Sequence, residues 1–273
     1  MSRAIQIISA AFWAALILAG CSENKAALKE STGRLDSFQA FPVPRPYAKA
    51  VSDTRGNTVY ALGRESQEID IFVDGVRVNS IGGLGFGKAN FQRLSDIGVD
   101  TDGGLLALDS ARKLLKKFSS GGMFISELKF DDLSQPELFC VAPDGTLFVY
   151  DAAPSEIICY SPLDGREFNR FGRFELDRPV NLDCNKDYLW AHNLEKGSTR
   201  VFVLLGQHLA TLPQIAALDR SGAYFSAHKP ESGAGSGQAL LSLNVQGNLV
   251  TVLWEQMIWL GRLGYARSSD EAE

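Results

Sequence analysis

Residues 93–130 read RLSDIGVDTDGGLLALDSARKLLKKFSSGGMFISELKF, and this stretch decides the fold. It contains four short apolar runs, at 97–99, 105–108, 114–118 and 124–128. Turn residues rich in Gly, Asp and Ser separate these runs. Short apolar runs with such boundaries favour strands joined by tight turns over helices. The stretch therefore predicts four consecutive strands of one sheet.

The same arrangement recurs along the chain at intervals of about forty residues. Two positions recur in step: a turn glycine after a strand-like run, and a residue that follows the middle strand of each unit. The glycines are Gly75, Gly121, Gly165, Gly206 and Gly247, with separations of 46, 44, 41 and 41 residues, and the second position holds Gly63, Asp109, Asp151, Asn193 and His228. A period of this size with four strands per unit indicates a β-propeller.

The middle strands agree with this interpretation. Residues 147–150 (LFVY) and 189–191 (LWA) are apolar at successive positions, so both of their faces must be covered. A propeller blade packs between two neighbouring blades and meets that requirement. The repeats therefore need one another to be stable.

Both chain ends fit a ring that closes on itself. Residues 25–33 (KAALKESTG) align loosely with 113–121, and 35–41 resemble an outermost strand. Residues 257–260 and 263–266 are expected to form an inner pair of strands. We thus predict an all-β fold, a β-propeller of six four-stranded blades over residues 25–267, with two N-terminal and two C-terminal strands in the last blade. Five blades is the alternative, because 25–33 could instead be a tether, and 268–273 is expected to be an acidic tail.

The N-terminus has the features of an export signal. Arg3 precedes an apolar core at 5–18 that is shorter than the ~20 residues needed to span a bilayer. Leu18-Ala19-Gly20-Cys21 then resembles the lipobox of bacterial lipoproteins, and the resemblance implies cleavage after residue 20, acylation of Cys21 and a short tether over 21–24. The alternative is a secretory signal with a chance cysteine, or a short anchor. In the lipoproteins that this motif resembles, an Asp after the cysteine signals retention at the inner membrane, so Ser22 implies the outer membrane of the bacterial cell envelope, facing the periplasm.

Three units resemble NHL repeats: residues 60–72 (YALGRESQEIDIF), 105–118 (LLALDSARKLLKKF) and 147–160 (LFVYDAAPSEIICY). The chain as a whole is similar to six-bladed NHL-type bacterial lipoproteins. The resemblance implies the fold but says little about which activity the protein has, because propellers host unrelated functions.

Composition excludes some partners. The chain has 45% hydrophobic and 22% charged residues, as in ordinary globular proteins, and a net charge of −5. A nucleic-acid partner would normally be bound by a basic patch. No nucleic-acid partner is therefore expected for this acidic chain. Cys140, Cys159 and Cys184 remain beside Cys21, an odd number without CxxC spacing. They are interpreted as small buried core residues, although an exported compartment permits a disulfide.

Candidate site residues lie near the starts of the predicted inner strands, which line the central channel of a propeller. Propeller lactonases and related hydrolases place Glu, Asn and Asp around a divalent metal there, and this resemblance implies Asp96, Glu137 and Asn181 as ligands for Ca²⁺ or Mg²⁺. However, Asp96 and Asn181 share a repeat position at which Leu138 falls. A solvated channel mouth would show similar residues, so no metal site, cofactor or catalytic residue is assigned.

Other motifs have simpler explanations. Residues 83–87 (GLGFG) do not match GxGxxG and precede no helix, so they are expected to form a connector between blades. The sequence thus predicts a membrane-anchored binding or scaffold lipoprotein that meets a protein, peptide or glycan at a propeller face. The alternatives are a metal-dependent hydrolase or lyase that uses the channel, and a subunit of an envelope assembly complex.

Overall fold

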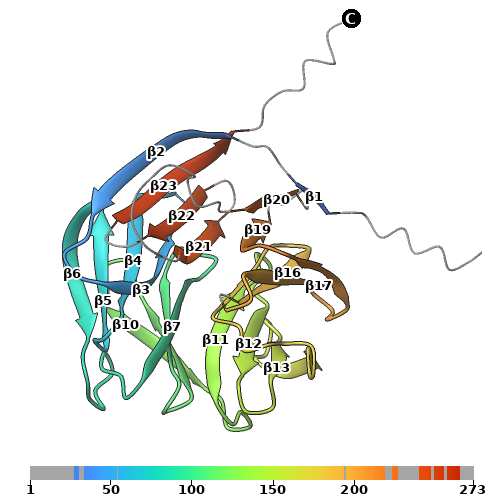
Figure 1. The fold of residues 1–273 in the computed structure, drawn as a ribbon. Helices are drawn as coiled ribbons and strands as arrows, with labels where there is room; N and C mark the ends of the chain where they lie inside the picture. Colours follow the sequence, from blue (N-terminus) through green and yellow to red (C-terminus); the bar gives the residue numbers. More distant parts are fainter. Residues whose placement is uncertain are drawn as a thin grey trace, which may run out of the picture.

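The protein is a β-propeller, with sheets arranged around a central axis (Figure 1). The computed structural model describes residues 28–30, 34–53, 55–193, 195–218, 223–226, 240–246, 249–254 and 257–264. Within these ranges, no helix is long and apolar enough to cross a membrane.

The first four sheets follow the chain in order, each from the inner strand outward, and every neighbouring pair of strands is antiparallel. The predicted four strands of 93–130 are confirmed as one sheet. The sheets consist of β3 (Tyr47–Ser52), β4 (Thr58–Gly63), β5 (Glu68–Val73) and β6 (Val76–Gly82); β7 (Leu94–Val99), β8 (Leu105–Asp109), β9 (Leu114–Phe118) and β10 (Phe124–Lys129); β11 (Pro136–Val141), β12 (Leu147–Asp151), β13 (Glu156–Tyr160) and β14 (Glu167–Phe171); and β15 (Asn181–Cys184), β16 (Tyr188–Asn193), β17 (Ser198–Val203) and β18 (His208–Leu212).

A further four-stranded sheet joins the two ends of the chain. Its order is β2-β23-β22-β21, in which β2 (Arg34–Pro42) is N-terminal and β21 (Leu240–Gln246), β22 (Leu249–Trp254) and β23 (Met257–Gly264) are C-terminal. Closure by strands from both ends is confirmed, but the expected two-plus-two division is wrong. Residues 257–264 form one continuous strand, because β23 pairs with β2 on one side and β22 on the other.

Two strands near the C-terminus differ from the prediction. The strand-like run before Gly247, which the repeat places in a fifth unit, contains β21, and β21 is the inner strand of the closing sheet. Residues 29–30 form β1 (Lys29–Glu30), which pairs with β20 (Ala223–Ser226) beside β19 (Ala216–Leu218) and does not enter the closing sheet. Short apolar runs resemble one another, so only pairing distinguishes an inner strand from a third one.

The number of complete blades matches the alternative. The described residues form five four-stranded blades, and β1, β20 and β19 form a three-stranded sheet. A sixth four-stranded blade is not confirmed. Residues 227–239, between β20 and β21, lie outside the described residues, together with His228 of the predicted repeat.

The hydrophobic core consists of layers between neighbouring blades. Ile69 of β5 and Phe118 of β9 share one layer, whereas Tyr150 of β12 and Phe202 of β17 share another. A further layer joins the closing sheet to the first blade. Each blade therefore covers a face of the next one, as the apolar middle strands predict.

Every blade has two distinct ends. We call the end that carries the connections between blades and the turns from second to third strand the connector end, and the opposite end the hairpin end. At the connector end, Asp109 accepts hydrogen bonds from the backbone N–H groups of Gln92 and Arg93, at 3.0 and 3.1 Å. Asp151 accepts equivalent bonds from Ser134 and Gln135. The recurring aspartate therefore serves the fold by holding the connection that leads into its own blade.

Candidate functional site

The first candidate site is the centre of the propeller, where the inner strands lie. β3 contacts β7, β7 contacts β11 and β11 contacts β15, while β21 contacts β3 and β19. One position recurs on these strands just after a β-bulge or at the strand start. Lys49, Asp96, Leu138 and Asn181 occupy it, opposite Leu62, Leu108, Tyr150 and His192 of the respective second strands.

Lys49 and Asp96 form a buried ion pair at this centre. Lys49 Nζ lies 2.8 Å from Asp96 Oδ1, and the two side chains are 9% and 1% exposed. Asp96 also accepts hydrogen bonds from the N–H groups of Ile97 and Phe139, each at 2.9 Å. Burial raises the pKa of Asp96, while Lys49 and these N–H groups oppose the rise. The carboxylate therefore has three internal donors.

Asn181 and His192 form a second buried pair. His192 Nε2 lies 2.8 Å from the carbonyl oxygen of Ala216, so Nε2 must carry the proton. The other ring nitrogen, Nδ1, is then an acceptor, and Asn181 Nδ2 donates to it at 3.3 Å. This arrangement leaves Asn181 Oδ1 buried without a hydrogen-bond donor. Burial lowers the pKa of His192 to about 4, so the ring is neutral at neutral pH.

Two cysteines lie in the core beside this centre. Cys140 of β11 and Cys184 of β15 belong to one apolar layer, together with Cys159. All three are free and buried, as expected from the sequence. Burial raises the pKa of both Cys140 and Cys184, so neither thiol is an activated nucleophile.

The three candidate metal ligands make separate contacts. Asp96 pairs with Lys49, and Asn181 bonds to His192. Glu137 lies at the connector end, where Arg93 Nη2 is 3.1 Å from its Oε1 and Gln135 also donates to it. In the part of the chain that the structure describes, no three His, Cys, Asp or Glu residues are grouped so that they could hold a metal ion.

Sequence reasoning missed the partners of these candidates. Lys49 lies in the strand 47–52 (YAKAVS), at the same repeat position as Asp96. This shared position is the one sequence signal that could have indicated that the two side chains meet. His192 lies beside the recurring position that Asn193 occupies, which predicts an exposed turn residue, but its ring is buried. That interpretation is wrong because the ring pairs across β15 and β16, which the sequence position at a strand end did not indicate.

The second candidate site is the connector end, where two phenylalanines are exposed. Phe86 and Phe174 are 78% and 96% exposed, and each lies on a connection between blades. Phe174 also has a φ of 66°, which is unfavourable for a bulky side chain. Strained positions of this kind occur often at functional sites. These observations mark the connector end as a binding surface to test.

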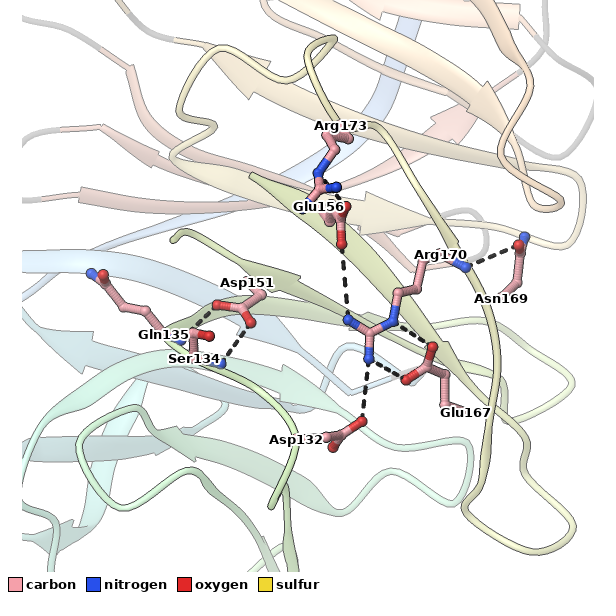
Figure 2. A network of polar contacts seen from close by, with 9 residues as sticks. All are labelled: Asp132, Ser134, Gln135, Asp151, Glu156, Glu167, Asn169, Arg170 and Arg173. Carbon is pink, nitrogen blue, oxygen red and sulfur yellow. Dashed lines mark hydrogen bonds and ion pairs between the residues drawn. The ribbon is translucent and has the colours of Figure 1, made fainter. Parts of the chain in front are cut away.

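An ion network holds the connection that carries Phe174. Figure 2 shows Arg170 between Glu167, Glu156 and Asp132, with Arg173 on the far side of Glu156. Arg173 Nε lies 2.7 Å from Glu156 Oε1. Hydrogen bonding from Arg170 lowers the pKa of Glu167. The network therefore fixes the backbone on the N-terminal side of the exposed phenyl ring.

A buried lysine holds the connection that carries Phe86. Lys116 Nζ bonds to the carbonyl oxygens of Gly87, Lys88 and Asn90, at 3.3, 3.2 and 2.5 Å. It also lies 5.0 Å from the centroid of the Phe91 ring. Burial lowers the pKa of Lys116. The connection 83–91 is thus ordered around an ammonium group, and no phosphate site is needed to explain its glycines.

Comparison with known proteins identifies the fold. No family model matches the chain, and no curated protein matches it. Among solved structures, selenomethionine-substituted virginiamycin B lyase from Staphylococcus aureus matches with a TM-score of 0.52 and 11% identity, over 84% of this chain and 99% of that one. A catalytically inactive variant of that lyase with quinupristin matches with a TM-score of 0.52 and 12% identity, over the same shares of the two chains. At such identities the similarity establishes a shared β-propeller fold and nothing about activity.

Proposed function

We propose that this chain is a lipid-anchored binding protein of the bacterial cell envelope, facing the periplasm, that holds a protein partner at the connector end of its propeller. The observation that carries the proposal is the pair of exposed, pre-positioned aromatic rings, Phe86 and Phe174. Aromatic side chains dominate the binding energy of protein interfaces. Positions fixed by Lys116 and by the Arg170 network lower the entropy cost of binding.

The anchor part of the proposal rests on the sequence. Residues 1–20 and the motif Leu18-Ala19-Gly20-Cys21 support export and acylation of Cys21. Two or three acyl chains on one residue would give stable membrane attachment, whereas a single chain is marginal. At the propeller centre, Lys49 and Asp96 pair with each other, so neither side chain needs a substrate or a metal ion to balance its charge.

Replacing Cys21 by serine is expected to abolish lipidation. The protein should then lose the mass of the acyl chains and move from the membrane fraction to the soluble fraction, because no acyl group is attached. Intact-mass spectrometry and fractionation measure both changes. Ser22→Ala, which leaves the acceptor cysteine in place, is the matched control. An unchanged mass and membrane fraction in Cys21→Ser would refute the anchor.

Replacing Phe174 by asparagine is expected to weaken partner binding at least about tenfold, as for an interface hot spot. Folding stability should hold or rise by about 1 kcal/mol, since asparagine tolerates a positive φ better than phenylalanine. Crosslinking and pull-down from membrane extract, with thermal unfolding in parallel, measure the two effects. Val78→Ser, at an exposed position on the outer strand β6 and in neither proposed contact surface, is the control and should retain the partner. Equal partner recovery with all variants would reject the connector end as the binding surface.

The alternatives lead to different results in the same experiments. A subunit of an assembly complex would be recovered in stoichiometric amounts with several proteins. A metal-dependent hydrolase or lyase is the other alternative, which the fold shared with a lyase keeps open. It would require Asp96 or Asn181 to exchange present partners for Ca²⁺ or Mg²⁺. A rise in unfolding temperature with either ion, lost in Asn181→Ala, would favour it.

A further inference from the structure

An exposed apolar side chain lies at the hairpin between third and fourth strands in each of the first four blades. These side chains are Val76, Met123, Leu163 and Leu205, with exposed fractions of 65, 73, 95 and 79%. Single exposed apolar residues are ordinary on protein surfaces. Within this hairpin Val76 and Met123 follow the turn glycine, whereas Leu163 and Leu205 precede it. Packing of the individual blades does not explain why the same hairpin carries an exposed apolar residue in four successive blades. We call these four side chains the hairpin rim.

The backbone beneath the rim is fixed by neighbouring blades. Asn79 of β6 donates to the carbonyl oxygen of Gly121 in the next hairpin, at 2.9 Å. Asn169 of β14 makes the equivalent bond to Leu205, at 3.0 Å. Gly206 has a φ of 96°, and a Cβ there would lie 2.4 Å from the Phe171 ring. The glycine lets the hairpin approach the preceding blade, which fixes the direction in which Leu205 projects.

The first residue of β2 and the last residue of β23 lie at the hairpin end of the closing sheet. In the closing sheet, the third strand is β23 and the fourth is β2, and Gly264 pairs with Arg34 where other blades have a hairpin. The short strand β1 runs parallel to β20, so the chain enters it from the hairpin end. Residues 21–27 can extend at most about 24 Å. A lipid on Cys21 would therefore hold the hairpin end close to the membrane.

We propose that the hairpin rim lies against the lipid surface and orients the propeller, so that the connector end faces away from the membrane. This inference rests on the proposed lipid anchor. The contact is apolar because all four rim side chains are apolar, and in the hairpin that carries Leu163 the charge of Arg166 is balanced by Asp164. The rim should therefore contact zwitterionic lipid as readily as anionic lipid. The same orientation leaves Phe86 and Phe174 free for a partner.

Environment-sensitive labels on introduced cysteines test this orientation. Cys140, Cys159 and Cys184 are buried and Cys21 would carry lipid, so a new surface cysteine is the reactive thiol. The lipidated full chain is placed in phosphatidylcholine vesicles, with and without phosphatidylglycerol, and in vesicles that carry a lipid-bound quencher. Labels at Met123→Cys, Leu163→Cys and Leu205→Cys are expected to shift to shorter wavelength and to be quenched. A label at Phe174→Cys, at the opposite end, should remain unchanged.

Each outcome decides between the two proposals. Vesicle-bound protein with quenching at the rim and not at Phe174 supports the rim. Two results would overturn the proposed contact between the rim and lipid while leaving the lipid anchor intact. One is vesicle-bound protein with equal quenching of the labels at both ends, and the other is rim quenching only when phosphatidylglycerol is present. Protein that does not sediment with vesicles overturns the anchor and the rim together. In a variant that combines Leu163→Ser and Leu205→Ser, the label at Met123→Cys should no longer be quenched by lipid. The remaining apolar contact is then too small to hold the orientation.

Discussion

Lys49→Met is expected to lower the free energy of unfolding by about 3–5 kcal/mol, the cost of leaving a buried charge without its partner. The Asp96 carboxylate would keep its bonds from Ile97 and Phe139 but lose the ammonium group at 2.8 Å. Because Asp96 is buried, its negative charge would then be only partly compensated. Urea titration followed by circular dichroism measures the loss.

Two further variants separate the ion pair from general damage to the core. Lys49→Met combined with Asp96→Leu should recover much of the stability, since apolar replacement of a buried pair is often neutral or favourable. Lys117→Met removes a lysine that pairs with Asp100 and Asp102 nearer the surface. Surface pairs of that kind contribute about 0–1 kcal/mol. If the double variant were less stable than Lys49→Met alone, the buried charge would not be the cause.

The sequence predicts the blade architecture well because a blade is specified locally. Residues 93–130 contain the apolar runs and turns of a complete sheet, and the observed β7 to β10 coincide with them within a few residues. Turn glycines mark backbone with positive φ, as at Gly75 and Gly165, while Gly122 rather than Gly121 takes this role in the second blade. These signals involve neighbours in sequence and can be read without a structure.

The closing sheet and the centre depend on contacts between distant residues. Ser52 and Thr251 are 199 residues apart, yet their hydroxyl groups lie 2.8 Å from each other. No periodic pattern reports such a pair, so the division of strands between the two chain ends was predicted incorrectly. The partner of Asp96, Lys49, belongs to another blade, and no local pattern indicates that the two residues meet. The sequence alone therefore leaves Asp96 as a possible metal ligand.

Stability is expected to fall as pH decreases from about 6.5 to about 4, with His192 as a principal cause. The folded protein keeps this ring neutral because burial lowers its pKa to about 4, from an ordinary value of 6.5. In the unfolded chain the same ring takes up a proton at the ordinary value. The unfolded state therefore binds more protons in this window and is favoured as pH falls, by up to about 3 kcal/mol in total.

His192→Gln should remove this contribution, because glutamine does not titrate and can still donate an amide N–H to the carbonyl of Ala216. The measurement is the free energy of unfolding at several pH values, compared between variants. His208→Gln, which replaces the histidine of β18 that bonds to Thr211 at the surface, is the matched control for the substitution itself. Equal acid sensitivity of wild type and His192→Gln would show that other groups cause the decline.

The two buried pairs are expected to influence each other. The positive charge of Lys49 contributes to the low pKa of His192, after burial, which is the larger cause. Lys49→Met should therefore raise the pKa of His192, measurable by NMR titration of the ring. Since a higher folded pKa lies closer to the unfolded value, the acid-dependent loss of stability should become smaller in that variant. An unchanged pKa would mean that the two pairs act independently, and that the centre of the propeller is a set of separate contacts rather than one coupled polar cluster.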